Sequence, residues 1–271
     1  MLQLRVILLW ITGILFLLCR SVMASPDDNR GPKELLIGIS FSIPPYVIQE
    51  KDNGLELEVL RQAFEVKGYT VLPSYLPLAR TFMSFEDGSL DGVINVKEGM
   101  VNGHYSDIVI TFQNYAISLS EKNLKIDSLQ DLGGKSVAAF QRAAFILGAD
   151  FANVVLSNSD YLEVADQSLQ VKQLFRDRVE VIVMEEKIFK YFRKWLFNRS
   201  VALKGNYIVN ERNLRRKVRY HNIFPPSEYR FAFLSAQVRD DFNEGLRTII
   251  RNGRYEAILE RYSQDMALPP T

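Results

Sequence analysis

Short apolar runs alternate with amphipathic helical segments from residue 34 almost to the end of this chain. Residues 34–40 read ELLIGIS, an almost wholly apolar run that is typical of a buried strand. The pattern then predicts a helix over 56–67 that ends at Gly68, a strand over 70–75, a short helix over 81–86 and a strand over 92–94. This order predicts an α/β fold with mostly parallel sheets flanked by helices.

A second series of the same kind begins after a strand predicted at 115–119. We expect a capped helical turn at 128–131, strands at 136–140 and 179–184, and helices at 143–151, 166–175 and 187–195. The segment 197–226 is polar and basic, and its pattern predicts no element. A strand at 229–234 and two helices, the last reaching about Tyr262, complete the chain.

The first 24 residues are predicted to be a cleaved secretory leader. A short cationic start is followed by the apolar run 6–18 and by Val22-Met23-Ala24, a cleavage site of the V-x-A kind. Leu18, which is not small, precedes Cys19, so a lipid anchor on that cysteine is not expected. We therefore expect cleavage after Ala24, no lipid anchor, and a free product in the periplasm.

Cysteine and charge exclude several classes of function. The chain has one cysteine, Cys19, so the exported form can make no disulfide. Loss of Arg5 and Arg20 would take the 33 Lys and Arg to 31, against 32 Asp and Glu. This near-neutral balance and the predicted export both argue against a nucleic-acid partner. The basic run from Arg212 to Arg219 is interpreted as a solvated surface patch.

Signatures of catalysis and of metal binding are scarce. No phosphate-binding glycine loop, dinucleotide fingerprint or nucleophile elbow is present. The two histidines, His104 and His221, lie far apart in the chain and have no cysteine or carboxylate cluster at ligand spacing. We therefore expect neither a metal ion nor a cofactor.

Two similar segments predict where a ligand would bind. Residues 85–95 and 175–185 each read as a helix end, a tight turn, an acidic residue, a buried strand and a polar residue. Ligands of open α/β sheets bind beyond the carboxyl ends of the strands, which indicates Asn95 and Glu185. The loop Phe41-Ser-Ile-Pro-Pro-Tyr46 follows the first strand and is either one wall of a small-molecule cleft or a proline-stiffened turn with Tyr46 in the core.

Six short motifs, in the same order, resemble those of the bacterial extracellular solute-binding proteins, family 3, which serve polar amino-acid ABC importers. The resemblance spans about residues 34–264. The matching motifs are Pro44-Pro45-Tyr46, Gly54-Leu55-Glu56-Leu57-Glu58, Gly88-Ser89-Leu90-Asp91, Tyr105-Ser106-Asp107, the stretch from Leu129 to Val137, and Gly253 to Ile258.

This resemblance implies the two-lobed periplasmic-binding-protein fold of type II, with two hinge crossings and a ligand held between the lobes. Lobe one would comprise residues 34–113 plus 228–271, and lobe two residues 114–227. The implied protein is a monomer that captures a small polar solute, amino acid-like or related, and delivers it to an ABC permease without changing a bond.

Two alternatives to the importer role remain open at this point. One is a sensory protein that docks on a membrane receptor or kinase; a fused sensor would carry a membrane helix after about Tyr262, and none is expected before Thr271. The other is a dehydratase-like enzyme on the same fold, for which Glu185 is the one clear acid or base.

The departures from the family pattern concern how a ligand carboxylate would be held. The segment 96–104 contains no arginine, although the family places its carboxylate-binding arginine there. Arg142-Ala143-Ala144 replaces a second carboxylate-binding turn, whereas Glu185 matches the acid that receives the ligand amine.

Candidate ligand residues are therefore drawn from both lobes. They are Phe41, Tyr46, Arg80, Asn95, Gln141, Arg142 and Glu185. An anionic ligand is favoured if both arginines face the cleft, and a cationic or amine ligand if only Glu185 does.

Overall fold

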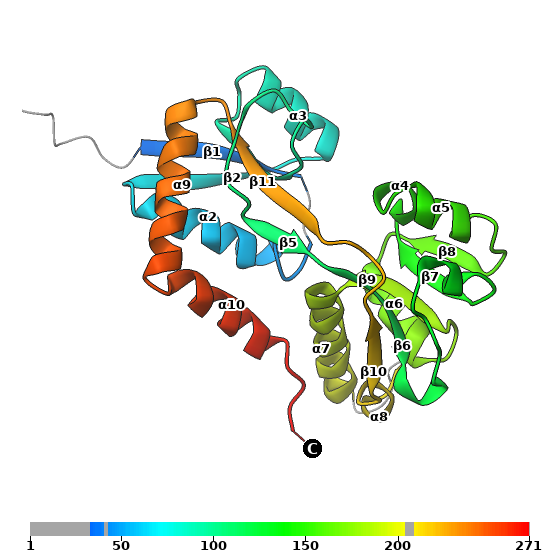
Figure 1. The fold of residues 1–271 in the computed structure, drawn as a ribbon. Coiled ribbons are helices and arrows are strands. Elements are labelled where there is room, and N and C mark those ends of the chain that lie inside the picture. The colour runs from blue at the N-terminus through cyan, green and yellow to red at the C-terminus, as the bar shows by residue number, and fades with distance from the viewer. Residues whose placement is uncertain (1–32, 41–42, 204–208, 271) are drawn as a thin grey trace, which may run out of the picture. The chain divides into compact units, whose positions relative to one another are not determined.

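The computed structural model describes residues 33–40, 43–203 and 209–270. The predicted leader and Phe41 lie outside these described residues. Residues 34–271 form one compact unit, which holds two β-sheets, each flanked by helices (Figure 1). The α/β class predicted from the sequence is therefore confirmed.

The first sheet has six strands in the order β2-β1-β3-β11-β4, with β5 paired to β11. Its strands are β1 (Lys33–Ile39), β2 (Tyr69–Tyr75), β3 (Gly92–Val96), β4 (His104–Tyr105), β5 (Ile110–Phe112) and β11 (Ser227–Phe233). β1 and β3 are parallel, while β11 runs antiparallel to β3, β4 and β5.

Four helices belong to the part of the chain that forms the first sheet: α2 (Leu55–Glu65), α3 (Leu78–Glu86), α9 (Ala236–Arg251) and α10 (Arg254–Asp265). The ring of Phe64 on α2 lies 5.3 Å from Phe242 on α9 and 5.5 Å from Phe233 on β11. Gly245 allows the two helices to approach, because a Cβ there would lie 2.0 Å from the Ala63 carbonyl oxygen. This buried aromatic cluster holds the helices on the sheet.

The second sheet has five strands in the order β10-β6-β9-β7-β8. They are β6 (Asn114–Leu119), β7 (Val137–Phe140), β8 (Tyr161–Val164), β9 (Val181–Glu185) and β10 (Val218–His221). β7 is parallel to β8 and β9, but β6 is antiparallel to β9 and β10. Both sheets are thus mixed and not mostly parallel, because the strands that connect them run against the parallel core.

The remaining described helices are α4 (Ala143–Ile146), α5 (Ala149–Val155), α6 (Gln167–Phe175), α7 (Glu186–Ala202) and α8 (Glu211–Leu214), with 3-10 turns η1 (Gln49–Lys51), η2 (Ser120–Lys122) and η3 (Leu129–Leu132). The single helix predicted over 143–151 is wrong, since Gly148 breaks it with φ +98°. The segment 197–226 contains the end of α7, α8 and β10. None of the described helices is both long enough and apolar enough to span a bilayer.

The chain passes between the two sheets twice. Gln113 separates β5 from β6, and residues 222–226 separate β10 from β11 (Figure 1). The Gln113 side-chain amide donates to the Phe224 carbonyl at 2.9 Å and to the Asn222 side chain at 3.1 Å. One glutamine therefore joins both crossings.

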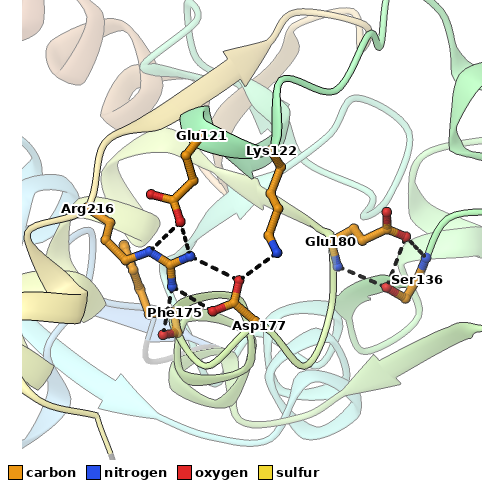
Figure 2. Close-up of polar contacts among 7 residues, drawn as sticks. All are labelled: Glu121, Lys122, Ser136, Phe175, Asp177, Glu180 and Arg216. Carbon is orange, nitrogen blue, oxygen red and sulfur yellow. Dashed lines mark hydrogen bonds and ion pairs between the residues drawn. The ribbon is translucent and has the colours of Figure 1, made fainter.

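A polar network built on Arg216 stabilises the second-sheet part of the chain (Figure 2). Its guanidinium pairs with Glu121 and, at 2.8 Å, with Asp177, which Lys122 also contacts at 3.1 Å. Hydrogen bonding to Arg216 and Lys122 lowers the pKa of Asp177 to about 2. Every partner of the guanidinium is a group of this protein, so the network is interpreted as structural.

Replacing Arg216 by Ala should destabilise the protein by about 1–2 kcal/mol, because the change leaves Glu121 and Asp177 without their shared partner. Urea unfolding of this variant beside Arg212→Ala, an exposed arginine four residues away, would measure the loss. Equal stability of the two variants would contradict the structural role.

Candidate functional site

Tyr46 is held rigidly between β1 and α2. Its side chain is fully buried, and the ring centroid lies 4.4 Å from that of Phe112. Its carbonyl oxygen accepts the backbone N–H of Glu56 at 2.9 Å. Gly54 makes this approach possible: its φ is +138°, and a Cβ there would lie 2.3 Å from that same oxygen. Of the two alternatives for this loop, the one that places the Tyr46 ring in the core therefore holds for the ring.

Glu185 ends β9 and caps α7. It is 3% exposed, and its carboxylate accepts the backbone N–H of Ile188 at 2.9 Å. The position follows from the sequence locally, since β9 is buried along its whole length and the acidic residue comes where the helix begins. Burial raises the pKa of Glu185, with the hydrogen bond from Ile188 opposing that shift.

The structure brings Tyr46 and Glu185 together, although they come from parts of the chain that form different sheets. Burial raises the pKa of Tyr46 well above its usual range, and the nearby Glu185 carboxylate raises it further. Among the described residues, the Tyr46 hydroxyl has no hydrogen bond of normal geometry. A buried phenol beside a buried carboxylate is a polar centre that a small donor could complete.

Asn95 lies at an irregularity of the first sheet. Its φ of +59° is left-handed, and the register between β3 and β11 shifts beside it. Its side-chain oxygen is buried, and no described group donates to it. The side chain thus lies at the bulge and its buried oxygen has no described donor, so it could accept a hydrogen bond from a ligand.

The turn after β7 is already occupied by a carboxylate of the protein. Glu163 accepts the backbone N–H of Arg142 at 2.6 Å and that of Ala144 at 2.9 Å, and the Tyr161 hydroxyl at 2.8 Å. The exposed Arg142 guanidinium lies 4.9 Å from the Phe145 ring, and Gln141 is also exposed. These two N–H groups are therefore not free for a ligand carboxylate.

Arg80 is exposed on the first turn of α3. It contributes weakly to a lowered pKa of Asp87, at the other end of the same helix, after the hydrogen bonds from Ser89. The structure thus groups Tyr46 with Glu185, and it places Arg80, Gln141 and Arg142 on exposed positions.

Sequence reasoning did not single out Glu56. It lies in the first turn of α2, is fully buried, and neither of its carboxylate oxygens has a described hydrogen-bond partner. Burial raises its pKa to about 8. The G-x-E-x-E motif gave its position, but no local pattern shows that the first of the two glutamates is enclosed.

The two histidines lie on strands, His104 on β4 and His221 on β10. His221 is buried against Ser118 at 2.9 Å and the Ile126 carbonyl at 3.1 Å, and burial lowers its pKa. In the described part of the chain, no three His, Cys, Asp or Glu side chains are grouped as metal ligands. The arrangement of Tyr46, Asn95 and Glu185 offers acceptors and one hydroxyl, which suits binding of a polar donor.

No protein-family model matches the chain. No curated protein matches it either. Solved structures do match, at low identity. The GluR0 ligand-binding core in complex with L-glutamate has TM-score 0.61 at 16% identity and covers 84% of this chain and 97% of its own. A histidine kinase sensor domain similar to periplasmic binding proteins has TM-score 0.59 at 17% identity, over 86% and 97%.

An amino acid ABC transporter substrate-binding protein of Streptococcus pneumoniae, bound to L-arginine, has TM-score 0.60 at 14% identity. This match covers 87% of the chain and 97% of that protein. At these identities the likeness establishes the fold. The two-lobed binding-protein fold that the sequence motifs predicted is confirmed, and with it the resemblance to amino acid substrate-binding proteins at the level of structure.

Proposed function

We propose that this protein is an exported solute-binding protein that captures a small polar solute carrying an amine, and that it changes no covalent bond in it. The observation that carries this proposal is the meeting of Tyr46 and Glu185, two buried polar side chains contributed by different parts of the chain. Two crossings joined by Gln113 connect those parts and would act as the hinge.

The charge of the site favours an amine. Glu185 is a buried carboxylate, and an ammonium group beside it would replace the water that burial removes. A ligand carboxylate finds less support, because Glu163 holds the N–H groups of Arg142 and Ala144. Tyr46 and Asn95 would then contribute neutral hydrogen bonds.

Delivery to an ABC permease is the partner role that we propose. Several solved structures of the same fold are substrate-binding proteins or domains of amino acid ABC transporters. A sensory role is the second candidate, because a histidine kinase sensor domain shares the fold equally well. Uptake of the identified solute by cells with and without this protein separates the two, since a sensor that is lost leaves uptake itself intact.

A thermal-shift screen tests the binding role directly. The purified protein would be melted in the presence of amino acids, polyamines, ethanolamine-type amines and organic acids. A solute that binds the folded form raises Tm. At one hundred times its Kd, the solute stabilises the folded protein by about 2.7 kcal/mol. We expect amines to be among the stabilising solutes. Stabilisation by organic acids alone would contradict the charge argument.

A further inference from the structure

A cavity of about 780 Å³ has Pro45 in its wall, but neither Tyr46 nor Glu185 lines it. Its walls come from the loop that follows Pro45, from one side of α2, from α7 and from the end of α10. The cavity is lined by none of the described residues that the sequence predicted to bind a ligand, which are Tyr46, Arg80, Asn95, Gln141, Arg142 and Glu185. The volume is within the range of small-molecule pockets.

Aromatic rings form much of this cavity, which we call the α7–α10 pocket. Tyr191 and Trp195 come from α7, and Tyr262 comes from α10. All three are half-buried, so each presents part of its ring to the cavity while its remaining surface is packed. Rings arranged in this way bind an apolar or aromatic body by stacking and by removal of water.

The charges that line the α7–α10 pocket leave an excess of cations. Two of the four cations are satisfied: Arg61 pairs with Asp52 at 2.6 Å, and Arg261 pairs with Glu58. The ammonium groups of Lys51 and Lys194 contact no carboxylate in the described part of the chain. Lys194 donates to the Ala267 carbonyl at 2.7 Å.

Further charges surround the pocket. Arg199 and Lys172 lie 4.7 and 5.8 Å from the Trp195 ring and add positive charge. On the acidic side, Asp265 lines the pocket, and Glu50 is close enough to contribute to the raised pKa of Tyr191. With Asp52 and Glu58 included, the lining and its neighbours hold six cations and four acids, so an excess of positive charge remains.

We propose that the α7–α10 pocket is a second ligand site, which takes a small organic acid with an aromatic or apolar body. The ring of the ligand lies against Trp195 and Tyr262, and its carboxylate is held between Lys51 and Lys194. This site is separate from the amine site at Glu185 and takes the opposite charge. Because its walls include both α7 and α10, an occupant bridges parts of the chain that form different sheets.

Trp195 makes the proposal directly measurable. The chain has two tryptophans, and the other is Trp10, within the predicted leader. The full chain would be expressed, purified and titrated with phenylacetate while tryptophan fluorescence is followed, with phenethylamine as a probe of the same ring and opposite charge. We expect a saturable change with phenylacetate at a Kd of about 1 mM or tighter. In the Glu185→Gln protein, where no amine site competes, the response to phenethylamine should be weaker than that to phenylacetate.

Four variants assign the signal. Trp195→Phe should abolish the fluorescence change, and Lys51→Gln should weaken phenylacetate binding about fivefold or more. The matched control Lys217→Gln, an exposed lysine outside the pocket, should bind as the unaltered protein does. Glu185→Gln should also retain phenylacetate binding, so the outcome does not depend on the amine site.

Three results would overturn the second site. They are no saturable response to phenylacetate, equal or stronger binding of phenethylamine by the Glu185→Gln protein, in which the amine site is removed, and an affinity that Lys51→Gln leaves unchanged. A loss of binding in Glu185→Gln would place phenylacetate in the amine site instead. Calorimetry on the Trp195→Phe variant, which needs no tryptophan signal, shows whether binding itself is weakened as the stacking argument requires.

Discussion

Replacing Glu56 by Gln should stabilise the protein progressively as the pH rises from about 4.5 to about 8. The folded-state pKa of Glu56 is raised by burial to about 8, against an ordinary value of 4.5. The folded protein therefore holds a proton on Glu56 that the unfolded chain releases, and stability is lost as pH rises through this window. At pH 8 and above, the free energy of unfolding of the Glu56→Gln variant should exceed that of the unaltered protein by roughly 3–5 kcal/mol.

Urea unfolding at pH 5, 7 and 9 would measure this effect. The two proteins should differ little at pH 5, where Glu56 is neutral in the folded state, and most at pH 9. Glu65→Gln, an exposed glutamate on the same helix, provides the control and should follow the unaltered protein at every pH. If the two proteins differed in free energy of unfolding by the same amount at all three pH values, the folded-state pKa of Glu56 would not be raised.

The Glu185→Gln variant should lose the stabilisation by an amine solute found in the thermal-shift screen. Removing one member of a buried charge pair leaves the ligand ammonium desolvated without a partner, at a cost of about 2–5 kcal/mol. This corresponds to at least about thirtyfold weaker binding. Calorimetric titration of the solute into both proteins would measure it.

The neighbouring acid offers a matched control for that experiment. Glu186 pairs with Lys190 at 2.5 Å on the surface of α7 and is half-buried, unlike Glu185. Glu186→Gln should bind the amine within about twofold of the unaltered protein, because an exposed ion pair contributes little. If both variants bind equally well, Glu185 is not the residue that receives the amine.

Regular elements were largely predictable because their signals are local. Apolar runs identified β1, β3 and β9, and the amphipathic stripe of Phe242, Leu246 and Ile249 identified α9, since one buried face produces that spacing. The short strands β4, β5, β8 and β10 were missed. Each has at most four residues, and tertiary pairing rather than propensity holds them in place.

The candidate site was predictable only in part. Strand order and a polar residue at the end of β9 pointed to Glu185, and the structure places Tyr46 beside it. Arg80 and Arg142 were weighed as ligand cations from their positions in the chain, and both are exposed in the structure. The direction of the Arg80 side chain depends on where α3 begins, and that of the Arg142 side chain depends on the left-handed backbone at Arg142. No residue pattern specifies either feature.

By itself, the sequence determined the α/β class, the order of the main elements and the acidic residue at the carboxyl end of β9, because these follow from local spacing. The tertiary structure alone decided which polar groups are enclosed. Glu56 and Glu58 lie two positions apart in one motif at the start of α2, yet Glu56 is fully buried with no described hydrogen-bond partner, whereas Glu58 is partly exposed and pairs with Arg261. Burial depends on what packs around a residue from distant parts of the chain, and that information is absent from its neighbours in sequence.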